Sequence, residues 1–495
     1  MTKFLFVIVI LLPILGGILV PLLDFAKRGA RELYIMAVVT ANSVLCWYML
    51  ANLKGASLTI YHLTRTIDIT LRLDGMGSVF VLLVSVLWPL ACLYAFEYME
   101  YIHKKNQFFM FYTMSYGVTL GVALSANLIT MYLFYEILTL CTFPLVGHEG
   151  TRETRVASNK YLVYSIAGAT AAFIGIIVLL THGASLDYSV IGFSPEIIRN
   201  DRALFELAFL FMFFGFGVKA AIWPLHGWLP TAGVAPTPVT ALLHAVAVVK
   251  SGVFAIARVI YYTYGTDFLH DTASQRIGLL FTAFTIVYGT VMAWREVHFK
   301  KRLAYSTISN LSYIVFAFML MTPAGLEAGL LHMVFHGVIK ITLFFVAGAV
   351  IHKTDRMYVT QLRGFAKKMP VSFGAFTIAS LGLMGVPPLC GFLSKFAIAE
   401  ASMEMGGLYG GMGVAALLVS AMFTTMYLMT IVIRAYFPPS DFNMSEIDDV
   451  KEVNWYITLP LCLLCIAIVA LGIYSGPLRE LIFKAALDAF PGLGL

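Results

Sequence analysis

Charge is what this sequence has least of. Only 12% of its 495 residues are Asp, Glu, Lys or Arg, whereas 60% are hydrophobic and the mean hydropathy is +0.85. Soluble domains usually contain about 25% charged residues. This scarcity excludes a soluble globular protein, and no polar stretch is long enough for a separate soluble domain. The net charge of +6 comes from lysine and arginine in loops, so it does not indicate a nucleic-acid partner.

Cysteine is also scarce. Cys462 and Cys465 have the C-x-x-C spacing of a redox motif, but their hydrophobic run contains no second ligand pair. We therefore interpret them as small apolar filler. The sequence contains no ligand set for a flavin, a haem or an iron–sulfur cluster, and no nucleotide-binding loop, so we expect no cofactor. The six cysteines all lie in apolar segments: Cys46, Cys92, Cys141, Cys390, Cys462 and Cys465.

Long apolar runs dominate the rest of the chain. The first, residues 4–23, is long enough to cross about 30 Å of hydrocarbon, and we interpret it as a membrane span rather than a removable signal peptide. Runs of similar length predict an all-α polytopic membrane protein with about fourteen transmembrane helices. Their expected positions are 4–23, 33–53, 76–97, 108–125, 128–146, 158–181, 204–223, 237–262, 277–294, 303–321, 326–351, 372–400, 408–435 and 455–474.

Basic residues are concentrated in alternate loops. Loops that follow odd-numbered spans carry most of the 33 lysines and arginines; Arg295, Lys300, Lys301 and Arg302, for example, follow the ninth span. Positively charged loops usually stay in the cytoplasm. We therefore expect the odd-numbered loops inside and both termini outside.

Five cations fall inside the predicted spans instead of the loops. A charge near mid-membrane costs at least about 2.5–3.5 kcal/mol on insertion scales. Arg258 lies near the outer end of its span, where snorkelling to the interface would explain it. Lys250 and Lys340 are central in their spans, so snorkelling explains them poorly. The five residues are Lys219, Lys250, Arg258, Lys340 and Lys395.

Glu136 is the one carboxylate well inside a predicted span. Burial disfavours the charged form of a lone carboxylate, whereas a lysine on a neighbouring helix would keep both groups charged. Lys219 is the expected partner. Such a pair has two interpretations: a static bridge between two helices, or a group that handles protons. We favour proton handling because the buried lysines form a series.

The run LHMVFHGVIK places His332, His336 and Lys340 four residues apart, so all three project from one helix face. The histidine spacing also suits zinc, but no third ligand lies nearby and no glutamate occupies a general-base position, so we expect no metal. His244 precedes Lys250 by six residues, about 240° away on an ideal helical wheel. A kink or a bridging water would be needed to align them.

Prolines next to two of the lysines predict broken helices. Pro224 follows Lys219 in the seventh span, and Pro387 and Pro388 precede Lys395 in the twelfth. Broken helices at matching positions of two halves mark the site region of transporters built from inverted repeats. We therefore expect four parts: three helices in 1–103, a five-helix repeat in 104–265, an inverted second repeat in 266–436, and a loop, the last span and a short tail in 437–495.

Four motifs give the chain a family resemblance. They are WPLHGWLPTAGVAPTPVTALLHAVAVVKSGVFAIAR (223–258), LSANLITMYLFYEILTL (124–140), HMVFHGVIK and GFLSK (391–395). With them, essentially the whole chain resembles the antiporter-like membrane subunits shared by respiratory complex I, energy-converting membrane hydrogenases and Mrp-type sodium/proton antiporters.

The resemblance implies a proton relay across the middle of the membrane. Its residues would be Glu136, Lys219, His244, Lys250, His332, His336, Lys340 and Lys395. Two positions depart from the family, which often has an acidic residue at Thr231 and a histidine at Gly233. We expect both on the outer side, where the departure puts a peripheral exit route in doubt.

The expected function is therefore proton translocation within a multisubunit, redox-driven complex of the prokaryotic inner membrane. Partners would be other membrane subunits, including paralogous antiporter-like subunits and a redox module, and the ion would be H+. One alternative is a subunit of an Mrp-type antiporter, which would also move Na+. An independent solute carrier and a purely structural subunit are more remote alternatives, since the sequence shows no substrate pocket and every relay position is filled.

Overall fold

Apolar helices make up most of the computed structural model, which describes residues 2–23, 25, 27–64, 67–188 and 195–490. Ten helical stretches in these ranges are long and apolar enough to cross a membrane. Four further crossings are less apolar, shorter or broken. The prediction of an all-α polytopic membrane protein is therefore confirmed.

The first half of the chain contains eight crossings. They are formed by α1 (Leu5–Leu22), α2 (Arg28–Asn52), α3 (Gly75–Tyr98), α4 (Lys105–Ala123), α5 (Leu128–Val146), α6 (Arg152–Thr181), α7 (Pro195–Gly217) with the short α8 (Trp228–Thr231), and α9 (Thr237–Ala245) with α10 (Val248–Arg258).

The second half contains six crossings and a final helix that packs on the bundle. Its elements are the short α11 (Thr266–Leu269), α12 (Ala273–Arg295), α13 (Phe299–Met319), α14 (Pro323–Thr354), the short α15 (Phe365–Lys368), α16 (Pro370–Met384) with α17 (Cys390–Met405), α18 (Gly407–Tyr436), α19 (Trp455–Ile473) and α20 (Gly476–Ala489).

Polar residues set where several of these helices begin. The side chains of Asp74, Asn127, Thr272 and Thr322 each accept a hydrogen bond from a backbone N–H in the first turn of α3, α5, α12 and α14. Such N-caps satisfy donors that have no partner within the helix. These four caps lie in loops that follow even-numbered crossings, so they fix the helix starts at one end of the bundle.

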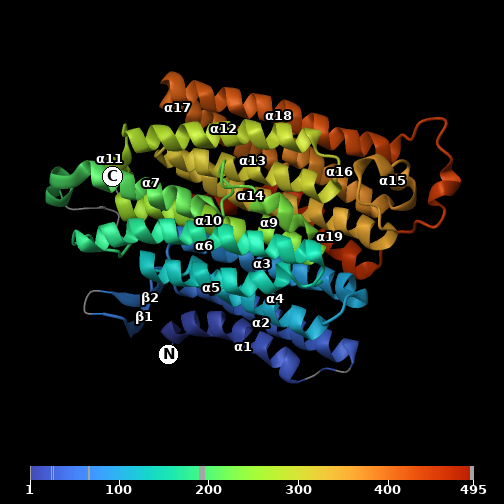
Figure 1. Cartoon of the computed structure of the whole chain (residues 1–495), viewed down its shortest axis with the longest axis horizontal. Coiled ribbons are helices and arrows are strands. Elements are labelled where there is room, and N and C mark those ends of the chain that lie inside the picture. Colours follow the sequence, from blue (N-terminus) through green and yellow to red (C-terminus); the bar gives the residue numbers. More distant parts are fainter. Residues whose placement is uncertain (1, 24, 26, 65–66, 189–194, 491–495) are drawn as a thin grey trace.

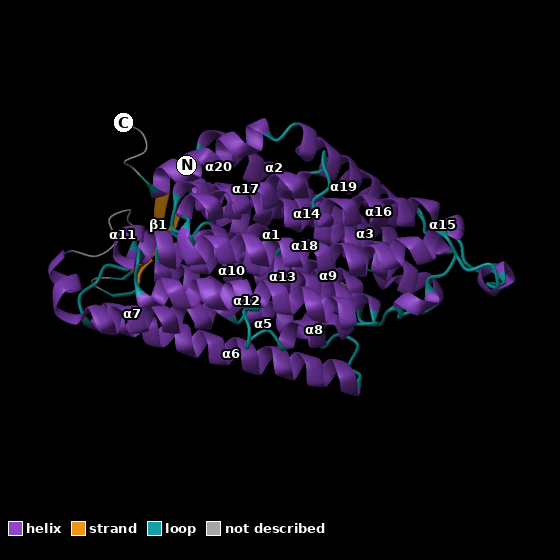
Figure 2. Ribbon diagram, turned by 90° about the horizontal axis from the view of Figure 1, so that it is seen from above, coloured by secondary structure: helices purple, strands orange, loops and turns teal. Residues whose placement is uncertain are grey.

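The crossings run roughly side by side, and their loops gather at two ends (Figure 1). One end carries α11 and the hairpin of β1 (Ser57–His62) and β2 (Asp68–Arg72); the opposite end carries α15 (Figures 1 and 2). The strands pair antiparallel, from Ser57 opposite Arg72 to His62 opposite Asp68. We call these the hairpin end and the α15 end.

Three crossings are interrupted. The seventh was predicted to run to residue 223, but α7 ends at Gly217 and residues 218–227 are not helical. The twelfth breaks between α16 and α17, as Pro387 and Pro388 predicted. The eighth was predicted as one helix, which is wrong, because α9 ends at Ala245 and α10 begins at Val248. The inverted relation of the two five-helix units stays a prediction.

The centre of the molecule is the eighth crossing together with α14. Both are buried over their whole apolar windows. The long helix α14 packs against α9, α13, α16 and α17, and therefore joins the two halves. Helices farther out expose large apolar side chains, such as Leu140 and Leu418, as expected of a lipid-facing surface.

Candidate functional site

Two glycine positions bring broken helices close to the buried lysines. A Cβ on Gly252 of α10 would lie 2.9 Å from the Cβ of Lys219, so α10 packs directly on the non-helical backbone after α7. Gly385 ends α16 with a φ of +91°, a conformation that favours glycine, and the chain then turns back toward α17 and Lys395. These contacts place Lys219 beside α10 and Lys395 beside the end of α16.

Lys219 and Glu136 form the predicted pair. The Lys219 amine is fully buried and lies 3.8 Å from Oε1 of Glu136, whose side chain is 27% exposed. The amine also donates to the backbone oxygen of Tyr135 at 2.5 Å. At 3.8 Å the pair is electrostatic without being a hydrogen bond, so a small movement can change its strength considerably in a low-dielectric site.

Lys250 and His336 connect the two halves. The buried Lys250 amine lies 2.7 Å from Nδ1 of His336, 86 positions later in the chain. This is hydrogen-bond distance, so the amine can donate directly to a neutral ring. Nε2 of His336 is buried without a hydrogen-bond partner among the described residues. The free nitrogen is therefore available to a further donor or acceptor in the interior.

His332 continues this row toward α17. Its ring centre lies 6.0 Å from that of His336, one helical turn away. Nδ1 of His332 is 2.9 Å from the hydroxyl oxygen of Ser394, and Nε2 is 3.3 Å from Oδ1 of Asn310. Lys395 follows Ser394, is partly buried, and donates to the backbone oxygen of Leu383 at 2.6 Å. The row thus runs from Lys250 through both histidines to the start of α17.

Lys340 lies beside this row. Its buried amine donates to the backbone oxygen of Leu303 at 3.0 Å and to the hydroxyl of Ser306, both on α13. The hydrogen bonds therefore direct Lys340 to α13, whereas His332 leads to Ser394 and α17. Lys340 is a side branch one turn from His336.

His244 occupies the last turn of α9. Its ring is fully buried, stands 4.7 Å from the ring of Phe344, and has no hydrogen-bond partner on either nitrogen within the described ranges. The non-helical residues 246–247 interrupt the eighth crossing between His244 and Lys250. The separation of about 240° expected for a continuous ideal helix therefore does not apply to His244 and Lys250.

Arg258 does not snorkel, and that expectation was wrong. Its guanidinium is fully buried and makes two hydrogen bonds to Asp74, of 2.6 and 2.8 Å. Tyr188, Phe254 and Tyr262 surround it, with ring centres 4.7–4.9 Å away. A bidentate partner compensates for the loss of water around the cation. The pair ties the end of α10 to the start of α3.

Lys300 is a buried cation that sequence reasoning placed in a loop. It lies in the first turn of α13, is 7% exposed, and donates to the backbone oxygen of Ala235 at 2.9 Å. The spacing would have indicated this, because Lys300 precedes Leu303 and Thr307 on one buried face. Burial raises the pKa of the Glu149 carboxyl, and Lys300 acts against that rise.

Thr231 and Gly233 lie together at the α15 end, in α8 and the short 3₁₀ turn that follows it. Thr231 accepts a hydrogen bond of 3.1 Å from Lys160, near the start of α6. That contact belongs to the α15 end, whose loops follow odd-numbered crossings and were predicted to be cytoplasmic. The outer location expected for these two residues and the inner location predicted for this end therefore cannot both hold.

These features define the class: a helical membrane protein of the antiporter-like type, with helices broken next to buried lysines and a row of amines and imidazoles between them. The chain belongs to the family described as NADH:quinone oxidoreductase/Mrp antiporter, TM, whose model matches residues 125–424. The match includes every residue of the predicted relay.

Curated relatives agree with this membership. NADH-quinone oxidoreductase subunit N of Desulforudis audaxviator is 29% identical over 437 residues, which cover 85% of each chain. NAD(P)H-quinone oxidoreductase subunit 5 of Paulinella chromatophora is 29% identical and covers 94% of this chain and 76% of its own. Na(+)/H(+) antiporter subunit A1 of Staphylococcus aureus is 28% identical over 97% of this chain, which spans only 62% of that longer protein.

Solved structures share the fold. A chain of the membrane-bound sulfane sulfur reductase, an archaeal respiratory membrane complex, superposes with a TM-score of 0.86 at 23% identity, covering 98% of this chain and 97% of its own. A chain of the Mrp complex from a Dietzia species gives 0.85 at 22% identity, with 98% of this chain and 52% of its own covered. At such identities the likeness concerns the fold alone.

Proposed function

We propose that this chain is the proton-translocating, antiporter-like subunit of a multisubunit membrane complex driven by a redox reaction. The observation that carries the proposal is the 2.7 Å contact between the Lys250 amine and Nδ1 of His336, which joins the two halves through groups that exchange protons. Neutral imidazole can accept a proton on one nitrogen and release one from the other. A static scaffold has no need of such a contact in a fully buried interior.

The proton would enter this row from Lys219. While Glu136 lies close, it favours the charged amine; when the two separate, the amine releases its proton more readily. The proton would then pass from Lys250 to His336, and on to His332 and Lys395. His244, with two free ring nitrogens, would act beside Lys250, and Lys340 would hold charge next to His336. Water would bridge the wider gaps.

The driving step would come from partner subunits. The relatives are named as subunits of quinone oxidoreductases and of an antiporter, and one structural neighbour is part of a respiratory complex. We therefore propose neighbouring membrane subunits, paralogous antiporter-like chains among them, and a redox module that moves the Glu136–Lys219 pair. The charge of the loops supports insertion in a prokaryotic inner membrane with the α15 end inside and both termini outside.

A second candidate is a subunit of an Mrp-type sodium/proton antiporter. The alignment with the Staphylococcus aureus antiporter subunit, which covers 97% of this chain, favours it specifically. In that case an opposing ion gradient would replace the redox module. Genes for hydrogenase or quinone-oxidoreductase subunits beside this one would support the first candidate, and only antiporter genes would support the second.

Replacing Lys219 tests both candidates. We expect Lys219→Ala to abolish proton movement in vesicles that contain the assembled complex, because the row loses its first proton-carrying group. Quenching of a pH-sensitive dye on addition of electron donor, or of sodium, measures this. Lys353→Ala, at an exposed lysine near the α15 end, is the control and should pump normally. Normal pumping by Lys219→Ala would remove Lys219 from the mechanism.

A further inference from the structure

Two hollows meet beside the row of buried lysines, at the hairpin end of the bundle. The first is a polar cavity of about 590 Å³ lined by Lys54, Arg72 and Lys484, together with Asp74, Ser78, Tyr262 and Asp488. The second is an apolar groove of about 600 Å³ between α3, α14, α19 and α20. Leu481 of α20 lines both, so the two hollows adjoin at this residue.

The charges of the polar cavity favour an anion. Three cations line it. Of its two carboxylates, Asp74 is already paired with the buried Arg258 and also lies 3.8 Å from Arg72. The other, Asp488, accepts the backbone N–H of Gly75 at 2.9 Å. Glu480 pairs with Lys484 at 2.6 Å, but both groups are exposed, so the bridge is weak. The hydroxyl of Tyr262 is buried without a partner among the described residues and completes a donor-rich wall.

The groove has the chemistry of a hydrocarbon chain. Its lining is almost wholly aliphatic, from Leu82–Leu90 of α3, Val334 and Val338 of α14, and Leu463–Leu471 of α19. The floor is buried, with Leu83 and Leu87 at 3% and 1% exposure, whereas Leu463 at the rim is 43% exposed. The groove is thus exposed at the Leu463 rim and closed toward the protein.

We propose that these adjoining hollows bind an anionic phospholipid, with its phosphate in the polar cavity and one acyl chain in the groove. A phospholipid is proposed because of the order of the two hollows. Cationic and hydroxyl groups line the polar cavity at the hairpin end, and the aliphatic groove continues from there along the helices. A soluble anion would leave the groove uncovered, and a transmembrane helix of a partner has no phosphate for the cations.

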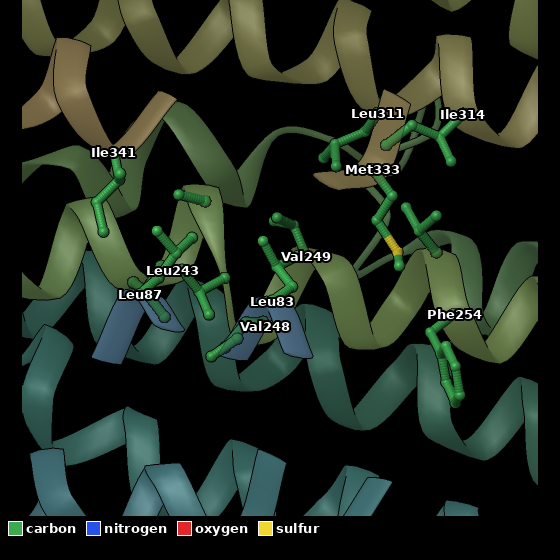
Figure 3. Close-up of a cluster of buried hydrophobic side chains, with 14 of the residues drawn as sticks. Leu83, Leu87, Leu243, Val248, Val249, Phe254, Leu311, Ile314, Met333 and Ile341 are labelled. Carbon is green, nitrogen blue, oxygen red and sulfur yellow. The ribbon is translucent and has the colours of Figure 1, made fainter. Parts of the chain in front are cut away.

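The bound acyl chain would support the broken eighth crossing. Leu83 and Leu87 of α3 form the groove floor and, on their other side, face Leu243 and Val248 at the two ends of the break (Figure 3). Val334 and Val338 of the groove alternate along α14 with His332, His336 and Lys340. The lipid therefore lies one helix layer from the Lys250–His336 contact.

The test compares lipids retained by the purified, intact protein in native mass spectrometry. Phosphatidylglycerol and phosphatidylethanolamine of identical acyl chains are the probes, and glycerol phosphate is the free headgroup. We expect preferential retention of phosphatidylglycerol and no retention of glycerol phosphate. The double variant Lys54→Gln/Lys484→Gln should reduce that preference by about fivefold for each lysine removed. The control Lys353→Gln/Lys367→Gln removes the same charge from exposed lysines near the α15 end and should change nothing.

A second variant tests the groove independently of the polar cavity. Ala467→Trp fills the groove and should abolish retention of both lipids without changing the unfolding temperature, because Ala467 is only partly buried. Equal retention of both lipids by the unaltered protein, or retention of glycerol phosphate, would overturn the proposal. So would a photo-crosslinking residue at Leu463 that, in the assembled complex, captures a protein in place of a phospholipid.

Discussion

Single side chains decide whether a charge can remain inside this bundle. Arg258 is stabilised by two hydrogen bonds to one carboxylate, whereas Lys219 has its carboxylate at 3.8 Å. The first arrangement is strong and static, since both acceptor oxygens are engaged. The second is looser and exposes part of Glu136. The geometry therefore distinguishes two kinds of ion pair. Arg258–Asp74 is tightly hydrogen-bonded, whereas the Lys219–Glu136 distance is long enough for the strength of the pair to change.

Glu136→Gln follows from this difference. The amide keeps the size of the side chain but removes its charge, so Lys219 loses the carboxylate that, in the proposed mechanism, controls how readily its amine releases a proton. We expect proton transport by the assembled complex to fall severely, with the amount of complex in the membrane unchanged. Dye quenching measures transport and blue native electrophoresis measures assembly. Loss of assembly instead would mean that the pair is a static bridge between helices.

The sequence predicted the buried ion pair correctly because charged residues are rare in apolar runs. Lysines and one glutamate in apolar runs are conspicuous, and the predicted Glu136–Lys219 pair is present. Prediction failed where the partner is distant: Asp74 lies 184 positions from Arg258, in the loop just before the span predicted at 76–97. A snorkelling arginine and a paired buried arginine have the same local sequence, so only the fold distinguishes them.

At the scale of elements, broken helices position the buried amines. Pro224, Pro387 and Pro388 made two breaks predictable, because proline removes a backbone donor. The break between α9 and α10 occurs in LLHAVAVVK, which contains neither proline nor glycine. The helix α9 packs against α14 and α3 there, and no local sequence pattern indicates a break. The helices themselves were predictable from hydropathy, with ends displaced by a few residues.

Gly252→Ala tests whether stability and transport require the close approach of α10 to the backbone after α7. The added methyl would fall within 2.9 Å of the Lys219 Cβ, so the backbone after α7 must shift. We expect a loss of about 1–3 kcal/mol in the free energy of unfolding, as for other overpacked cores, with a decrease in transport. Thermal unfolding and vesicle assays measure the two effects. Gly374→Ala of α16 is the matched control, since its Cβ would meet nothing within 4 Å. Full transport by Gly252→Ala would show that this contact does not position Lys219.

The whole molecule divides its loops between two ends with different tasks. The hairpin end carries the caps of α3, α5, α12 and α14, the Arg258–Asp74 pair and the polar cavity, whereas the α15 end carries the buried Lys300 and most of the loop cations. The sequence indicated this asymmetry through its basic loops. It could not indicate that Lys160 and Thr231 meet at one end, because that contact joins positions 71 apart.

The proposed orientation is testable on intact cells. A cysteine at Ile60 of the hairpin should react with a membrane-impermeant maleimide added outside, because we place the hairpin end outside. A cysteine at Lys367, at the α15 end, should react only after the membrane is opened. Both positions are exposed, so accessibility does not differ between them for other reasons. The reverse labelling pattern would invert the assigned topology.

The contact between Lys250 and His336 also limits stoichiometry. A gap of 2.7 Å between two nitrogens accommodates one hydrogen, so the amine and the ring at this junction cannot both be cationic without strong repulsion. In the proposed relay, a proton arriving from the first half would therefore wait until the junction has discharged toward the second. A subunit built in this way would advance its cargo singly, one ion for each cycle of its neighbours.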